Sequence, residues 1–196
     1  MTLQLVPGSV LSEQMLSERL RIGRTPIREA LQRLARERLV TILPRRGVMV
    51  SVIDVASQLR LLELRREVER LLARASAERA TSEQKEKFLA IASGMEKAAK
   101  NNDDIAFMRL DRELNLLVIE AARNDFAARS MKLMQGLSRR FWYMHYRTAA
   151  DLPRCARLHA DKALAIGRGN GKQAALATDA LMDYVETFTR ATVQIR

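Results

Sequence analysis

From Asp54 to the end of the chain, apolar residues recur at intervals of three and four, the spacing of one buried face of an α-helix. In a first helix, capped by Asp54 and extending to about Ala80, this spacing is carried by Leu61, Leu64, Val68, Leu71 and Ala75. Short polar breaks separate five further predicted helices, at about 82–101, 104–123, 126–147, 155–168 and 172–194. The pattern predicts an all-helical bundle.

Two of these predicted helices have apolar faces that are typical of helices packed into a core. The faces consist of Leu110, Leu114, Leu117 and Ala121, and of Met134, Leu137, Phe141 and Met144. The composition agrees, because glycine and proline, which weaken helices, number only 8 and 4 among 196 residues. We therefore expect a mainly α-helical fold.

The beginning of the chain has a different pattern, with two short helices followed by two short strands. Ser12 caps a helix at about 13–20, and a second helix covers about 24–38. Apolar runs at 40–43 and 48–53 flank the sequence PRRG, which predicts a hairpin with a basic tip. This order is typical of a winged helix-turn-helix, whose second helix enters the major groove of DNA.

The charge distribution favours a nucleic acid as the partner of this first region. Of the net charge of +11, residues 1–53 contribute +5, from nine arginines and four acidic residues. We predict a DNA-binding domain at 1–53 and a helical domain at 54–196. Arg24 and Arg28 lie on the outer face of the second helix, where guanidinium groups can bond guanine edges or clamp phosphates. Most charge runs are solvated helix faces, and that interpretation stays open beside the DNA one.

The sequence LSEQMLSERLRIGRTPIREALQRLARERLV, followed by PRRGVMV, resembles the winged helix-turn-helix of GntR-type transcriptional regulators, particularly the FadR-like branch. The resemblance implies six DNA-contacting residues: Arg24, Thr25 and Arg28, supported by Gln14, Arg46 and Gly47. Such domains begin with a further helix before the PG turn, whereas this chain starts at MTLQLVPG. We expect either a start upstream of Met1 or a version that lacks this first helix, which in the second case impairs DNA binding.

Four polar residues of the helical region are candidates for one shared site: Asp111, Asn115, His159 and Tyr184. Asp111 and Asn115 stand four residues apart, so their side chains project from the same face of a helix. Each residue also has an ordinary interpretation. An Asp–Asn pair is usually on the surface, a lone histidine is usually a hydrogen-bonded core residue, and a tyrosine usually closes a core with its hydroxyl outward. Both interpretations stay open.

The segments from Asp54 to Arg196 resemble the FCD effector domain that follows the DNA-binding domain in many FadR-like regulators. The resemblance is carried by LRREVER, DRELNLLVIEAARND, RLHADKALAI and GNGKQAALATDALMDYV. It implies a divalent metal held by one aspartate and three histidines, which helps to bind a carboxylate effector. Asp111 and His159 keep the implied residue types, but Asn115 and Tyr184 stand where histidines are implied.

An amide and a protonated phenol are poorer metal ligands than imidazole at neutral pH. We therefore expect no metal and no other cofactor, with Asp111 and His159 as only weak candidate ligands. We expect instead a polar effector site, in which Arg65, the position that resembles the family's pocket arginine, pairs with the carboxylate of a small organic acid. A surface salt bridge from Arg65 to Glu69 is an equal alternative.

These features predict a cytoplasmic, homodimeric transcriptional regulator that binds double-stranded operator DNA under the control of a small organic acid. An enzyme based on Asp111 and His159 is disfavoured, because no catalytic signature is present. A helical interaction protein derived from such a regulator is the other alternative. No apolar run approaches the roughly 20 residues that cross a bilayer, and the lone Cys155 excludes an internal disulfide.

Overall fold

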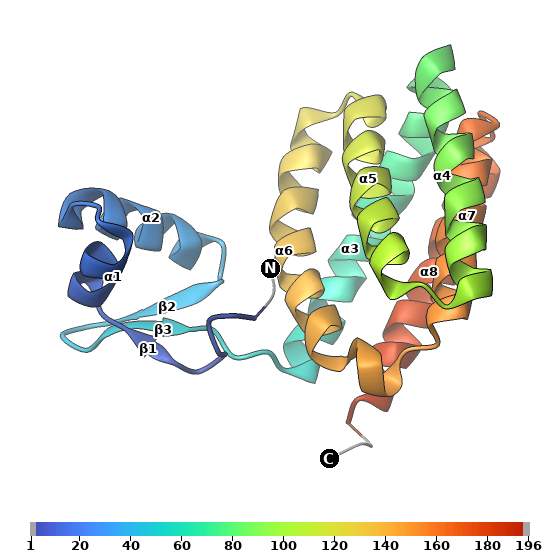
Figure 1. The fold of residues 1–196 in the computed structure, drawn as a ribbon. Helices are drawn as coiled ribbons and strands as arrows, with labels where there is room; N and C mark the ends of the chain where they lie inside the picture. The colour runs from blue at the N-terminus through green and yellow to red at the C-terminus, as the bar shows by residue number, and fades with distance from the viewer. Residues whose placement is uncertain (1–2, 194–196) are drawn as a thin grey trace.

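The computed structural model describes residues 3–193, which form a small winged-helix region beside a larger helical bundle (Figure 1). The ends of the two predicted domains, residues 1–2 and 194–196, lie outside the described residues. The winged-helix region contains β1 (Val10–Leu11), α1 (Glu13–Leu20), α2 (Arg24–Arg36), β2 (Val40–Leu43) and β3 (Gly47–Val50). The bundle contains α3 (Val55–Arg79), α4 (Ser82–Asn101), α5 (Asp104–Ala122), α6 (Asp125–Ala149), α7 (Leu152–Gly167) and α8 (Gly171–Ala191). The predicted fold class is confirmed.

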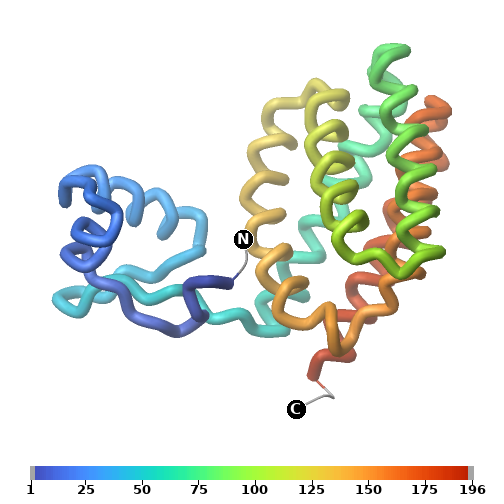
Figure 2. Tube along the Cα trace, viewed as in Figure 1, coloured from blue at the N-terminus to red at the C-terminus, as the bar shows by residue number. Residues whose placement is uncertain are grey.

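The winged-helix region has a three-stranded antiparallel sheet in the order β1-β3-β2. Val10 pairs with Met49, and β2 pairs with β3 from Val40 opposite Val50 to Leu43 opposite Gly47. The sequence analysis missed β1, because two residues are too few for a strand pattern. The predicted second strand is also shorter than expected, since β3 ends at Val50 and residues 51–54 lead to α3. Figure 2 follows this connection between the two parts.

The turn between β2 and β3 depends on two residues with left-handed backbone. The Arg46 N–H donates to the Leu43 carbonyl at 3.0 Å, and Arg45 has a φ of 61°. Proline at the second position, here Pro44, and a positive φ at the third are typical of a type II turn. Gly47 has a φ of 101°, and a Cβ atom there would lie 2.5 Å from the carbonyl oxygen of Leu11. Only glycine fits this contact between the wing and β1.

The ends of the bundle helices follow from local capping. The Asp54 carboxylate accepts from the Ser57 N–H at 2.8 Å, and Thr81 forms a capping box with Gln84. The helix predicted to begin at 155 begins earlier, at Leu152, where Asp151 caps α7. Pro153 lies in the first turn of α7, where a proline is tolerated because an N–H at that position has no partner within the helix.

The centre of the bundle is α3, which packs against α5, α6, α7 and α8, while α4 packs against α5 and α7. The predicted inner face of α5 is confirmed, since all four of its apolar residues are buried. The prediction for α3 was partly wrong, because Leu64 and Leu71 are 57% and 37% exposed, whereas Leu62 and Leu72 are buried. On α6, Met144 is exposed rather than buried. Two apolar rows of α3, offset by one residue, both satisfy the helical spacing, and the neighbouring helices decide which is covered.

Candidate functional site

The first turn of α2 is the most accessible part of the predicted DNA-binding surface. Arg24, Thr25 and Arg28 are all exposed there, and Gly23 before them supplies no side-chain cap. The free N–H groups of a helix N-terminus carry partial positive charge, which adds to the two guanidinium charges. An exposed, uncapped and basic helix start is suited to a phosphate or a base edge.

Arg28 has an acidic partner that the sequence analysis did not predict. Its Nε and Nη2 atoms donate to the carboxylate of Glu13 on α1, with an Nη2–Oε2 distance of 2.7 Å. The hydrogen bond and the charge of Arg28 lower the pKa of Glu13. Arg28 therefore reaches DNA only by releasing or sharing this carboxylate.

The other predicted contact residues lie on α1 and on the wing. Gln14 is exposed and donates to Glu18 at 3.0 Å, and Arg46 is exposed at the wing tip. Gly47 is partly buried, and its backbone conformation already explains why it is a glycine. Within residues 3–193, no side-chain hydrogen bond or ion pair joins any two of the six predicted DNA-contacting residues.

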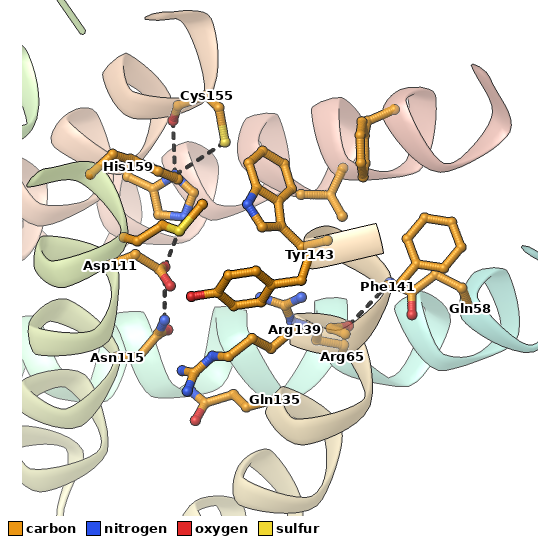
Figure 3. Close-up of a pocket in the computed structure, with 16 residues that line it drawn as sticks. Gln58, Arg65, Asp111, Asn115, Gln135, Arg139, Phe141, Tyr143, Cys155 and His159 are labelled. Carbon is orange, nitrogen blue, oxygen red and sulfur yellow. Dashed lines mark hydrogen bonds and ion pairs between the residues drawn. The ribbon is translucent and has the colours of Figure 1, made fainter. Parts of the chain in front are cut away.

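Inside the bundle, residues from α3, α5, α6, α7 and α8 enclose a cavity of about 90 Å³ (Figure 3). Four of the five predicted effector residues line it, namely Arg65, Asp111, Asn115 and His159. Aromatic side chains form much of the remaining wall, including Phe107, Phe141, Trp142, Tyr143 and Phe188. The cavity therefore combines charged groups with an apolar surround, which is the usual character of a small-molecule site.

Asp111 lies at the centre of the polar residues that line this cavity. Its Oδ1 atom accepts from the Asn115 amide at 2.8 Å and lies 3.3 Å from Nε2 of His159. Figure 3 shows Asp111 between these two side chains. The other ring nitrogen of His159, Nδ1, lies 2.8 Å from the carbonyl oxygen of Cys155. A carbonyl oxygen only accepts, so Nδ1 carries a proton and donates to it, while Nε2 lies next to the Asp111 carboxylate.

The pKa shifts agree with this assignment. Burial lowers the pKa of His159, but its contacts with Cys155 and Asp111 raise it to about 10. Burial raises the pKa of Asp111. The bond from His159 and the charges of His159, Arg65 and Arg139 lower it by more, so the net shift is downward. The pair is thus an imidazolium and a carboxylate near neutral pH.

Tyr184 is the predicted effector residue that the structure does not place at the cavity. It is buried in the core, and its hydroxyl donates to the Asp151 carbonyl at 2.9 Å. Burial raises the pKa of this phenol, so the proton stays on the oxygen. Tyr184 therefore holds the start of α7 against α8, and among the described residues its hydroxyl forms no hydrogen bond with Asp111 or His159.

Arg65 makes the ion pair with Glu69, but the pair is buried rather than at the surface. Arg65 Nε donates to Glu69 at 2.7 Å, and Lys162 of α7 donates to the other Glu69 oxygen at 2.5 Å. The Glu69 and Lys162 side chains are each 3% exposed. Arg65 therefore has features of both interpretations, the salt bridge and the effector site: it pairs with Glu69 through Nε and also lines the cavity.

The sequence analysis missed the contribution of α6. Gln135, Arg139 and Tyr143 all line the cavity, and they stand four residues apart on one face of the helix. This row of polar and aromatic residues was the available signal. It was overlooked because the apolar row through Met134 and Phe141 was taken as the inward face, and the cavity lies beside that row.

The donor groups do not fit a divalent metal. Among residues 3–193, no three His, Cys, Asp or Glu side chains lie close enough together to hold one. The Nδ1 atom of His159 donates to the Cys155 carbonyl, the Asn115 amide donates to Asp111, and the Tyr184 hydroxyl is bonded to Asp151. Of the implied ligands, one imidazole and one carboxylate are left, which is fewer than a protein zinc site normally has.

A second, larger hollow of about 510 Å³ lies where the winged-helix region joins the bundle. We call it the linker hollow; residues 51–54 form one wall, and α3 and α6 form the other. Arg140 of α6 is buried and donates from Nη2 to the Ser51 carbonyl at 2.5 Å. Gln58 and Phe141 line both the linker hollow and the cavity. The two spaces therefore share a wall.

Comparison with known proteins matches two families to two parts of the chain. Residues 60–184 match the family model described as "FCD domain", and residues 1–50 match "Bacterial regulatory proteins, gntR family". The chain is 25% identical over 192 residues to the HTH-type transcriptional repressor RspR of Escherichia coli K12, covering 98% of this chain and 83% of that protein.

Two further similarities concern a short segment and the fold. An uncharacterized HTH-type transcriptional regulator of Streptomyces ambofaciens is 46% identical over 56 residues, 29% of this chain, and this chain spans only 24% of its length. The solved structure of E. coli McbR/YncC has a TM-score of 0.78 at 17% identity, covering 95% of this chain and 89% of that one. At this identity the structural similarity shows the fold alone.

Within residues 3–193, no helix is long and apolar enough to cross a membrane.

Proposed function

This chain belongs to the FCD-domain family of GntR-type transcriptional regulators, and from that premise we propose that it binds operator DNA under the control of a small carboxylate effector. The family and the similar proteins are regulators, which confirms that the chain is not an enzyme. The observation that carries the proposal is the shared wall between the cavity and the linker hollow, because it connects a ligand site to the DNA-binding region.

The DNA-binding part of the proposal rests on the exposed start of α2. Arg24, Thr25 and Arg28 would meet the major groove, with Gln14 on α1 and the wing residue Arg46 alongside. Two copies of the chain would meet two half-sites of a near-palindromic operator. Release of Arg28 from Glu13 costs little, since both side chains are solvent-accessible and water replaces the lost contact.

The effector part rests on the charged groups of the cavity. Arg65 is held by Glu69 through Nε, and among the described residues Nη1 and Nη2 donate no hydrogen bond. Two parallel N–H groups of a guanidinium match the two oxygens of a carboxylate. The ligand binds without a metal, because the cavity supplies positive charge from its own side chains.

The coupling between the two sites would pass through α6. Arg139 lines the cavity, while the next residue, Arg140, bonds the Ser51 carbonyl between β3 and α3. A ligand that shifts or tightens α6 changes this contact and with it the placement of the winged-helix region. A coupling free energy of about 1–3 kcal/mol would change operator affinity roughly 5- to 150-fold.

The test is a fluorescence-anisotropy titration of the purified chain with duplex DNA from its own upstream region, at about 150 mM salt with excess competitor DNA. We expect competitor-resistant binding with two chains per operator. Arg28→Ala should weaken it about 5- to 150-fold and relax base preference, because a base contact is lost. Arg33→Ala is the matched control, since it removes the same charge from an exposed position later on α2.

Equal losses in both variants would mean that Arg28 contributes only charge. Binding that is weak and fades with salt would favour the alternative, an interaction protein with impaired DNA binding.

A further inference from the structure

The cavity contains a second guanidinium group, whose donors form no hydrogen bond among the described residues. Arg139 makes no hydrogen bond or ion pair with any described residue, although it lines the cavity and is only partly exposed. An arginine in such a place normally pairs with a carboxylate or a backbone oxygen, because its five donors lose their bonds to water. Arg139 and the free Nη atoms of Arg65 are therefore two separate sets of unused donors, on α6 and α3.

The charges that line the cavity do not cancel. Two guanidinium groups, those of Arg65 and Arg139, line it, whereas Asp111 is the one carboxylate among the described lining residues. Glu69 does not change this balance, because the buried Lys162 pairs with it. A ligand with two carboxylates would therefore pair with both guanidinium groups.

The volume limits the ligand. A cavity of about 90 Å³ is smaller than the roughly 150 Å³ cavity that holds a benzene molecule. An aromatic acid therefore requires rearrangement of the wall, whereas an aliphatic chain of about three or four carbon atoms does not.

We propose that the cavity recognises a small aliphatic dicarboxylate, with one carboxylate on Arg65 and the other on Arg139, and without a metal. This inference rests on the proposed function and specifies its effector. Two anchors on different helices favour a molecule with two separated carboxylates over a single compact anion. Such a ligand also ties α6 to α3, next to the Arg140 contact with the linker.

The experiment is isothermal titration of the full chain in EDTA with malonate and with malonamate, its monoamide of the same size and one charge less. We expect malonate to bind at least about tenfold more tightly, the ratio that one charge-assisted bidentate pair supplies. Inorganic phosphate tests a compact dianion, and benzoate tests the size limit. Both should bind more weakly than malonate.

The variant Arg139→Gln separates the two anchors. It should remove the preference for malonate while leaving malonamate affinity within about twofold, because Arg65 still holds one carboxylate. Arg129→Gln is the matched control, an exposed arginine on α6 that does not line the cavity. Circular dichroism checks that both variants are folded.

Four results would overturn the inference. Equal affinity for malonate and malonamate, or tighter binding of phosphate, would reject the dicarboxylate but keep a carboxylate or anion effector. Binding that requires added zinc or nickel would reject the metal-free site. Absence of binding by every probe would reject this inference together with the effector half of the proposed function, while operator binding by the same protein decides the DNA-binding half.

Discussion

The winged-helix region and the helical bundle are held together to very different extents. The buried core cluster of the first consists of Ile27, Leu31, Val40 and Val48, whereas the cluster of the bundle runs through every helix from α3 to α8. Large apolar side chains of the winged-helix region are also left in solvent, such as Leu20, which is 54% exposed. Since stability scales with apolar area removed from water, the bundle should unfold last.

The ion pairs differ in the same way. Glu13 and Arg28 form an exposed pair that solvent and salt screen, while Glu69 and Lys162 form a pair that is almost completely buried. Water can replace the contacts of the exposed pair, whereas the buried pair joins α3 to α7. The comparison teaches that the winged-helix region presents charged groups that are weakly held, while the helices around the cavity are joined by a buried ion pair.

The largest expected effect comes from removing the carboxylate at the centre of the buried network. Glu69→Ala leaves Lys162 and Arg65 without their partner, so the bundle should lose about 3–5 kcal/mol of unfolding free energy. Urea denaturation followed by far-ultraviolet circular dichroism measures this change. Glu67→Ala is the control, because that side chain lies on the same helix and is 66% exposed.

Acid should reproduce part of this effect. Burial raises the pKa of Glu69, but Arg65 and Lys162 together lower it to about 2, from a reference of 4.5. A lowered pKa stabilises the fold above the unfolded value, so stability should fall as the pH decreases from about 4.5 toward 2. The Glu69→Ala bundle should show a flatter acid limb, and an unchanged one would mean that Glu69 is not the titrating group.

A second prediction tests which apolar row of α3 faces the core. Leu72→Ala should destabilise the bundle by about 2–5 kcal/mol, since the side chain is 1% exposed and leaves a cavity. Leu64→Ala should change stability by less than about 0.5 kcal/mol in the monomer, because Leu64 is mostly in solvent. Thermal melts of the two variants compare them directly, and equal losses would indicate that another surface covers Leu64.

The smallest effect, about 1–3 kcal/mol, is expected for Gly47→Ala, which forces a Cβ atom against the Leu11 carbonyl. Because the winged-helix region has so small a core, this strain should unfold the wing and abolish operator binding while the bundle keeps its melting temperature. Hydrogen exchange resolves the two regions. Gly23→Ala is the matched control for folding, as its added Cβ has only a 3.8 Å contact with Pro26. Faster exchange throughout the bundle would contradict the independence of the two parts.

Most of the secondary structure could be read from local signals. Ser12, Asp54 and Thr81 cap the helices that were predicted to begin after them, because capping involves only neighbouring residues. The start of α7 was misplaced because Pro153 was taken as a break. β1 was missed because its two residues pair with a strand nearly forty positions later.

The candidate site was predictable only in part. Asp111, Asn115 and His159 were predicted from the residues themselves and Arg65 through the resemblance, and all four line one cavity, while Tyr184 does not. Arg139 was missed, because nothing in its local sequence distinguishes it from the solvated arginines around it. That its donors form no hydrogen bond among the described residues is a property of the packed helices.

The sequence by itself determined the order and ends of the helices, the winged helix-turn-helix and the family, because caps, periodicity and turn residues act over a few positions. The tertiary structure alone decided which row of α3 is buried, that Glu13 pairs with Arg28, and that Arg139 and Arg65 line the same cavity. These outcomes depend on contacts between residues far apart in the chain, which only the packing of one helix against another brings together.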